Sequence, residues 1–73
     1  MKETIIGSRI KAERTRAKMN RYQLGKLAGY SPETIRFWES GYTIPRSPAI
    51  IDLCDVLGCT ADYLLGRTDD REG

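Results

Sequence analysis

The chain has 73 residues and a mass of 8.3 kDa, which is room for one small domain and excludes two. Hydrophobic residues make up 40% and charged residues 30%, the balance of a globular protein rather than a disordered or fibrous one. The net charge of +2 is unevenly divided, because residues 1–46 carry ten Lys and Arg against four Asp and Glu, and residues 47–73 carry two against six. A basic front half suits a protein that approaches a polyanion, although small soluble domains also show such imbalance by chance.

Composition also limits the chemistry that we expect of the chain. There is no histidine, and two cysteines, Cys54 and Cys59, are too few for a four-ligand zinc site or for a disulfide framework. We expect two reduced thiols in or near the core, no metal and no cofactor. Without histidine, a glycine-rich phosphate loop or a nucleophile elbow, the sequence does not indicate an enzyme. No segment resembles a membrane span or a signal peptide, so we expect a soluble, cytoplasmic protein.

Hydrophobic spacing and capping residues predict five short helices and no strands, an all-α fold. The first helix is expected over residues 4–18, in a segment rich in Lys, Arg, Glu and Ala. Its inward positions recur at helical spacing: Ile6, Ile10, Arg14 and Ala17.

The second helix is expected over residues 21–28, after Asn20 as its N-cap. Gly29 is well placed as the left-handed residue that ends it. The expected inward positions are Leu24, Leu27 and Ala28.

The third helix is expected over residues 32–40, because Ser31 and Pro32 form a strong helix start and Gly41 a helix end. Its inward positions are expected to be Ile35, Trp38 and Glu39. The side chains expected to point elsewhere are Glu33, Arg36 and Phe37.

The fourth helix begins with the same pattern, Ser47 as cap followed by Pro48, and ends at Gly58. It is strongly apolar through Ile50, Ile51, Leu53, Cys54 and Leu57. We expect Asp52 and Asp55 on a solvated face opposite Ile51 and Cys54. Thr60 caps a last helix over residues 61–65, and the polar tail after Gly66 is expected to fray.

The segment from Asn20 to Gly41 carries the functional signal. Two helices of about eight residues joined by a short turn with a glycine form the helix-turn-helix arrangement. A steep crossing needs a small residue at the close approach, Gly25 or Ala28, and an apolar residue such as Ile35 beneath the turn. Any pair of antiparallel helices can show part of this pattern.

Further motifs in order along the chain make the pattern specific. They are IGSRI, an Arg in the first helix, LGKLAGYS at the turn, IRFWESG at the end of the third helix, and LGCTADYLLG near the C-terminus. From Ile6 to Gly66 the sequence therefore resembles the phage repressor/Cro (XRE) helix-turn-helix family. The resemblance implies a compact, lambda-repressor-like bundle of five helices, with residues 4–66 as the DNA-binding domain and residues 67–73 as a tail.

The resemblance also implies a function. Such a protein is a sequence-specific transcriptional regulator of a phage or bacterium, most simply a repressor, which binds double-stranded DNA as a homodimer and places residues 32–40 in the major groove of a palindromic operator. For dimer contacts, the end of the fourth helix with Tyr63, Leu64 and Leu65 are candidates, although these residues could equally pack the core.

In this family, the positions of Arg14 and Glu39 form a largely buried ion pair. Both lie on apolar stripes here, where each charge needs a partner. The alternative is that both long side chains reach solvent.

The resemblance assigns base readout to Pro32, Glu33 and Phe37, with Thr34 and Arg36 nearby. Pro32 offers no polar group, Glu33 can accept from cytosine N4, and Phe37 can contact a thymine methyl group. Arg36 is the strong candidate for bidentate recognition of guanine. We also expect DNA shape to contribute to specificity, because this set provides few direct contacts.

Contacts to the DNA backbone are expected from the start of the second helix and from the loop after the third: Arg21, Ser40, Tyr42, Thr43 and Arg46. The weak base-reading set also motivates an alternative, a protein-interaction or antitoxin-like module on the same fold, with Phe37 and Tyr30 as an apolar patch. The two functions are compatible in one protein.

Overall fold

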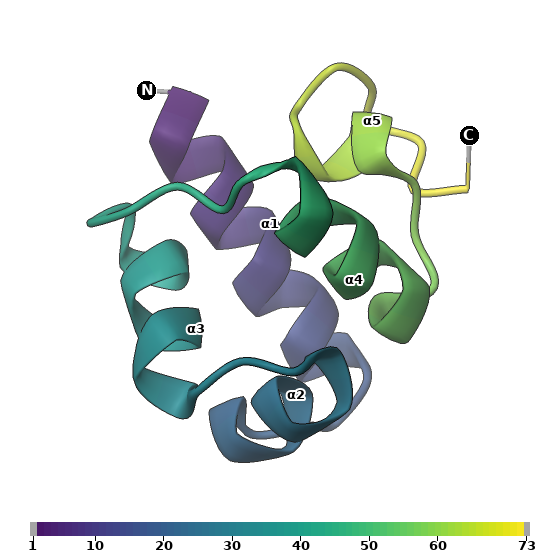
Figure 1. Cartoon of the computed structure of the whole chain (residues 1–73). Helices are drawn as coiled ribbons and strands as arrows, with labels where there is room; N and C mark the ends of the chain where they lie inside the picture. Colours follow the sequence, from purple (N-terminus) through teal and green to yellow (C-terminus); the bar gives the residue numbers. More distant parts are fainter. Residues whose placement is uncertain (1, 73) are drawn as a thin grey trace.

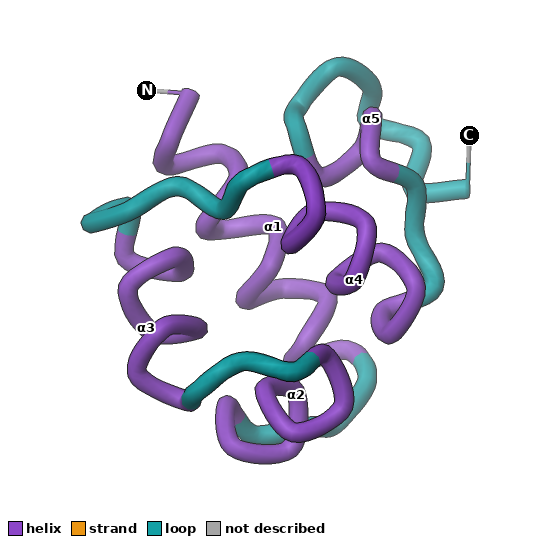
Figure 2. Tube along the Cα trace, in the orientation of Figure 1, coloured by secondary structure: helices purple, strands orange, loops and turns teal. Residues whose placement is uncertain are grey.

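The computed structural model describes residues 2–72, which form five helices and no strand (Figures 1 and 2). In chain order these are α1 (Lys2–Arg16), α2 (Arg21–Ala28), α3 (Pro32–Ser40), α4 (Ser47–Leu57) and α5 (Ala61–Leu64). The expected all-α bundle of five helices is confirmed. Within residues 2–72, none of the helices combines the length and hydropathy needed to cross a membrane.

Helix α1 runs through the middle of the bundle and contacts α3, α4 and α5, while α2 packs against α3 and α4 (Figure 1). Each helix contributes to one continuous core. Its buried members are Ile6, Ile10, Leu24, Ile35, Trp38, Ala49, Ile50, Leu53, Leu57 and Leu64. Because α3 uses only Ile35 and Trp38 for this core, much of its surface stays available.

Helix boundaries differ from the predicted ones at four places. Helix α1 begins at Lys2, two residues before the expected start. Helix α1 ends at Arg16, because Lys18 adopts a left-handed conformation with φ of 59°, and Ala17 therefore lies exposed in the turn. Ser47 is the first residue of α4 rather than its cap, since the extended residue before the helix is Arg46. Helix α5 ends at Leu64, one residue earlier than expected.

Two predicted inward positions, Ala17 and Leu27, are wrong. Leu27 is 66% exposed, because the buried face of α2 is centred on Leu24, Gly25 and Ala28 and the helical rotation turns Leu27 away from it. Ile51 is 57% exposed for the same reason on α4. Asp52 is half-buried rather than solvated, and its carboxylate accepts a hydrogen bond of 2.9 Å from the Tyr30 hydroxyl.

The junction between α2 and α3 is closed by two glycines. Gly29 has φ of 91°, and its amide donates to the carbonyl of Gly25. Gly25 is buried against the next turn, and a Cβ atom there would overlap with the carbonyl oxygen of Tyr30. The chain can therefore turn tightly and bring Ile35 into the core below the junction.

A carboxylate in the core connects the first three helices. The Arg14 guanidinium binds Glu39 through both oxygens, at 2.6 and 3.2 Å, and donates to the carbonyl of Met19 at 2.9 Å. Arg21 adds a third contact to Glu39, 3.0 Å from its Nε. The side chains of Arg14 and Glu39 are 13% and 2% exposed, so the carboxylate is buried, the guanidinium is mostly buried and the pair is internal.

We expect removal of either member of the Arg14–Glu39 pair to lower the free energy of unfolding by about 3–5 kcal/mol, because the remaining buried charge loses its bidentate partner. The variants are Arg14→Met and Glu39→Gln, measured by urea denaturation at neutral pH. The double variant Arg14→Met/Glu39→Met should lose clearly less than the sum of the single losses. Single losses below about 1 kcal/mol, the range of surface pairs, would contradict this account.

The C-terminal residues, which we expected to fray, pack back on α1. Arg71 binds the buried carboxylate of Glu13 at 2.7 Å, and its backbone carbonyl accepts from the amide of Thr60. Arg9 donates to the carbonyls of Tyr63 and Thr68 and lies over the Tyr63 ring, 4.2 Å from its centroid. Two arginines thus fix the segment after α5 to the first helix.

This contact makes stability depend on acidic pH. Hydrogen bonding from Arg71 holds the pKa of Glu13 below its ordinary value of 4.5, so the stabilisation is complete above that value and is lost as pH falls through the lowered pKa. We expect Arg71→Gln to lower the thermal midpoint at about pH 5 to 7, and the difference from the wild type to shrink in more acidic solution. Arg67→Gln is the control, because Arg67 is exposed and 3.8 Å from Asp62. A difference between wild type and Arg71→Gln that does not vary with pH would contradict the assignment.

Candidate nucleic-acid interface

Helix α3 divides into a buried and a solvent-facing side. Ile35 and Trp38 are buried, and the ring of Tyr30 packs edge-on against Trp38 with centroids 4.9 Å apart. On the other side Pro32, Glu33 and Arg36 are exposed, while Thr34 and Phe37 are half-buried. The structure thus brings the five residues predicted for base readout to the accessible part of one helix.

The first turn of α3 is occupied by its own cap. The Ser31 hydroxyl accepts from the amide of Thr34 at 3.1 Å, and the two hydroxyls of these residues are 2.8 Å apart. Pro32 stands in the first turn, where a missing amide costs no helical hydrogen bond. Glu33 is exposed at the positive end of the helix dipole, so it has both a structural role and a free carboxylate.

The second half of the exposed side is an aromatic cluster. The guanidinium of Arg36 lies over the ring of Phe37, 4.8 Å from its centroid. Phe37 also contacts Tyr42, with ring centroids 5.1 Å apart and planes inclined by 46°. Tyr30 faces Trp38 and Asp52 instead, so Phe37 finds its aromatic partner in the following loop and not in Tyr30.

The residues predicted to contact a nucleic-acid backbone fall into two groups. Arg21 is 38% exposed in its side chain and already donates to Glu39, and the Ser40 hydroxyl donates to the carbonyl of Phe37. Tyr42, Thr43 and Arg46 are exposed in the loop between α3 and α4. The second group is therefore free to meet a ligand, whereas the first is partly engaged within the protein.

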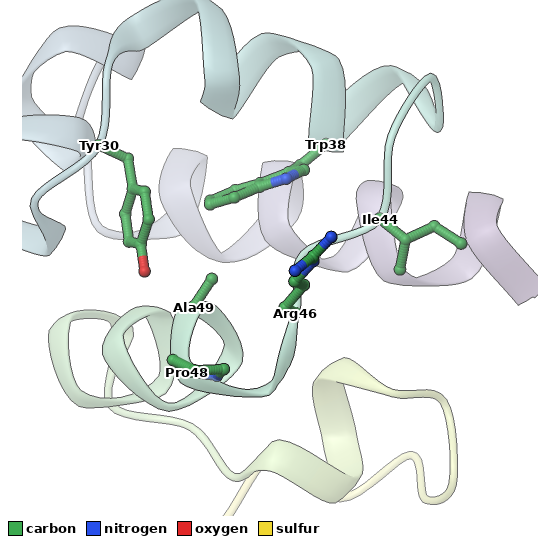
Figure 3. Close-up of a pocket in the computed structure, with 6 residues that line it drawn as sticks. All are labelled: Tyr30, Trp38, Ile44, Arg46, Pro48 and Ala49. Carbon is green, nitrogen blue, oxygen red and sulfur yellow. The ribbon is translucent and has the colours of Figure 1, made fainter.

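An open cleft of about 350 Å³ lies where this loop passes between α3 and α4 (Figure 3). Its lining residues are Tyr30, Trp38, Ile44, Arg46, Pro48 and Ala49. Arg46 extends from the start of α4 toward Trp38 and is the charged member of this lining (Figure 3). The cleft therefore adjoins the predicted backbone-contact loop and adds a cation beside it.

Burial lowers the reactivity of the two cysteine thiols. Cys54 and Cys59 are free, half-buried thiols at the end of α4. Burial raises the pKa of Cys54 to about 12 and also raises the pKa of Cys59, so both are protonated at neutral pH. Within the described part of the chain, no three His, Cys, Asp or Glu side chains are grouped so that they could hold a metal ion.

Two contacts at the interface were missed from the sequence. The ion pair between Arg21 and Glu39 joins residues 18 positions apart, and no local sequence pattern predicts it. The pairing of Phe37 with Tyr42 had a readable signal, because a left-handed glycine cap brings the residue four before the glycine close to the residue after it. Gly41 is such a cap, with φ of 82°.

Comparison with known proteins gives one curated relative, the repressor protein C2 of Salmonella phage P22. It is 37% identical over 65 residues, which are 89% of this chain and 30% of the relative. The chain thus spans about a third of the length of that repressor.

Two solved structures of the P22 c2 repressor are similar, each with 37% sequence identity. One is a crystal structure of that repressor in complex with the synthetic operator 9T in the presence of Tl⁺. It has a TM-score of 0.78, and the match covers 81% of this chain and 89% of the repressor chain. The solution structure of the DNA-binding domain of the same repressor has a TM-score of 0.81, and the match covers 89% of this chain and 86% of the repressor chain.

The family is established by a match over most of the chain. The profile of the helix-turn-helix family matches residues 10–64, which contain the second and third helices, the turn between them and most of the core. The chain belongs to the helix-turn-helix family.

Proposed function

We propose that this protein is a sequence-specific DNA-binding transcriptional repressor that places α3 in the major groove of its operator. The observation that carries the proposal is the close similarity in fold to a repressor solved on operator DNA, together with the accessible side of α3. Its action requires neither a cofactor nor catalysis, and it takes place in the cytoplasm, where bacterial and phage DNA is transcribed.

In this proposal the bases are read by the exposed side of α3. Arg36 donates to the O6 and N7 atoms of guanine, Glu33 accepts from a cytosine amino group, and Phe37 contacts a thymine methyl group. Pro32 and Thr34 contribute shape rather than hydrogen bonds, because Pro32 has no donor and the Thr34 hydroxyl belongs to the helix cap. Since direct contacts are few, the flexibility and groove width of the operator also contribute to specificity.

The DNA backbone is contacted on both sides of α3. The amides at the start of α2 and the Arg21 guanidinium face one phosphate strand, and Ser40, Tyr42, Thr43 and Arg46 face the other. The segment from residue 21 to residue 46 supports this role, since it carries four Lys and Arg against two Glu, and one of these, Glu39, is bound internally by arginines.

We further propose that the protein acts as a homodimer on a palindromic site, with the two recognition helices about 34 Å apart. Leu64 is fully buried and belongs to the core, which leaves the end of α4, Tyr63 and Leu65 from the earlier set of candidates. Leu65 is 42% exposed, and Ile51 on α4 adds a further exposed apolar side chain.

We expect binding to double-stranded DNA to weaken as the salt concentration rises. In a plot of the logarithm of the binding constant against the logarithm of the salt concentration, each phosphate contact contributes about −0.9 to the slope. Arg46→Ala should weaken binding across all sequences and reduce this slope by about one contact. Arg67→Ala is the matched control, because Arg67 is equally a surface arginine but lies after α5. Fluorescence anisotropy with labelled duplexes over a salt series measures both quantities.

The alternative is a protein-interaction or antitoxin-like module on the same fold. One observation favours it, namely that the accessible side of α3 carries an acidic residue, Glu33, and an aromatic side chain, Phe37, but no amide side chain. Absence of duplex binding by the wild type at low salt would support this alternative and reject the proposed repressor.

A further inference from the structure

Three side chains at the end of α3 form a continuous stack on the surface. The guanidinium of Arg36 lies over the Phe37 ring, and the Phe37 ring contacts the ring of Tyr42. Arg36 and Tyr42 are exposed and Phe37 is half-buried between helix and loop.

The backbone fixes the aromatic half of this stack. Gly41 adopts a left-handed conformation, and the chain folds back so that the Tyr42 amide donates to the carbonyl of Phe37 at 3.0 Å. The Ser40 hydroxyl donates to the same carbonyl at 3.0 Å and accepts from the Tyr42 amide at 3.3 Å. In this type of helix end, the side chains at the positions of Phe37 and Tyr42 contact each other. The aromatic platform is therefore held by the helix cap and does not depend on a ligand.

Arg36 has no competing ion-pair partner among the side chains that the structure describes. Among the ion pairs of the described residues none includes Arg36, although Glu33 lies three residues before it on the same helix. Arg21 shows the opposite case, since its Nε donates to Glu39. A guanidinium that lies over a ring uses its face for that contact and leaves the N–H groups along its edge free. Those N–H groups are what bidentate recognition of guanine requires.

We propose that Phe37 and Tyr42 are positioning residues that hold Arg36 ready to read one guanine in the operator. This inference rests on the proposed DNA-binding function and makes it specific, because it names the base and the side chains that set the preference. Phe37 restricts the long arginine side chain, and Tyr42 restricts Phe37. Tyr42 then acts on sequence preference through Arg36, in addition to its expected place beside the DNA backbone.

The two roles of Tyr42 predict different results. Loss of a backbone contact weakens binding to all sequences about equally. Loss of a positioning contact reduces the preference for one base at one position and leaves the other positions of the site unchanged. A binding-site selection from randomised duplexes, with sequencing of the bound pool, distinguishes these outcomes.

The selection compares the wild type with Arg36→Lys, Phe37→Leu, Tyr42→Leu and Tyr42→Phe. The wild type should enrich a guanine at one position in each half-site, and Arg36→Lys should lower that preference by roughly tenfold while keeping the positive charge and the salt dependence. Phe37→Leu and Tyr42→Leu should lower the preference at the same position by roughly two- to fivefold. Tyr42→Phe keeps the ring and should retain the base preference at this position, while any loss of a phosphate contact through the hydroxyl lowers affinity for all sequences alike.

The outcomes separate this inference from the proposed function. No duplex binding by the wild type rejects the function itself. A selected operator without an enriched guanine, or a guanine preference that Arg36→Lys leaves unchanged, overturns the assignment of Arg36. Equal weakening of all sequences by Tyr42→Leu, or an unchanged preference in that variant, overturns the positioning role. Tyr42 is 77% exposed, so its variants should fold, and circular dichroism with a thermal midpoint checks this. If Phe37→Leu is unfolded, the comparison of Tyr42→Leu with Tyr42→Phe decides the positioning role.

Discussion

The buried carboxylate of Glu39 is the interaction on which the rest of this structure depends. It lies at the end of α3 and is bound by Arg14 from α1 and by Arg21 from the start of α2. A charge with 2% exposure is costly unless its oxygens are satisfied, and here three hydrogen bonds satisfy them. Because these three side chains come from three different helices, the cluster of Arg14, Arg21 and Glu39 sets how the helices lie relative to one another.

This constraint also shapes the surface that the protein presents. Glu39 occupies the inward side of α3 together with Ile35 and Trp38, so the remaining side chains of that helix face outward as a set. The internal neutralisation of Glu39 leaves Glu33 as the exposed acid on α3, beside Arg36 on the same side. One end of the helix thus carries a capped first turn with the exposed carboxylate of Glu33, and the other carries the stack of Arg36, Phe37 and Tyr42.

The contacts of the C-terminal segment have the same character as those of Glu39. Glu13 is a second buried carboxylate, and Arg71 reaches it from 58 positions away in the sequence. Arg9 binds the same segment through two backbone carbonyls. In a small domain with a limited apolar core, such arginine contacts between distant segments connect the first helix to the last residues and add to the stability that hydrophobic burial provides.

The sequence by itself determined the five helices, the glycine-containing turn and most of the core, because capping and hydrophobic spacing are local properties that neighbouring residues express within a few positions. Ser31, Pro32 and Gly41 bound the third helix as expected, and Ile35 lies beneath the turn. Leu27 was wrongly assigned to the inward side and the apolar Ile51 is exposed, since an apolar residue near the edge of a helical stripe can face either way until the neighbouring helix is placed. Only the tertiary structure decided that Arg21 binds Glu39, that Arg71 fixes the tail to Glu13 and that Arg36 lies over the ring of Phe37. Each of these long, flexible arginine side chains could reach several partners. Which partner it contacts depends on distances between segments that exist only in the folded chain.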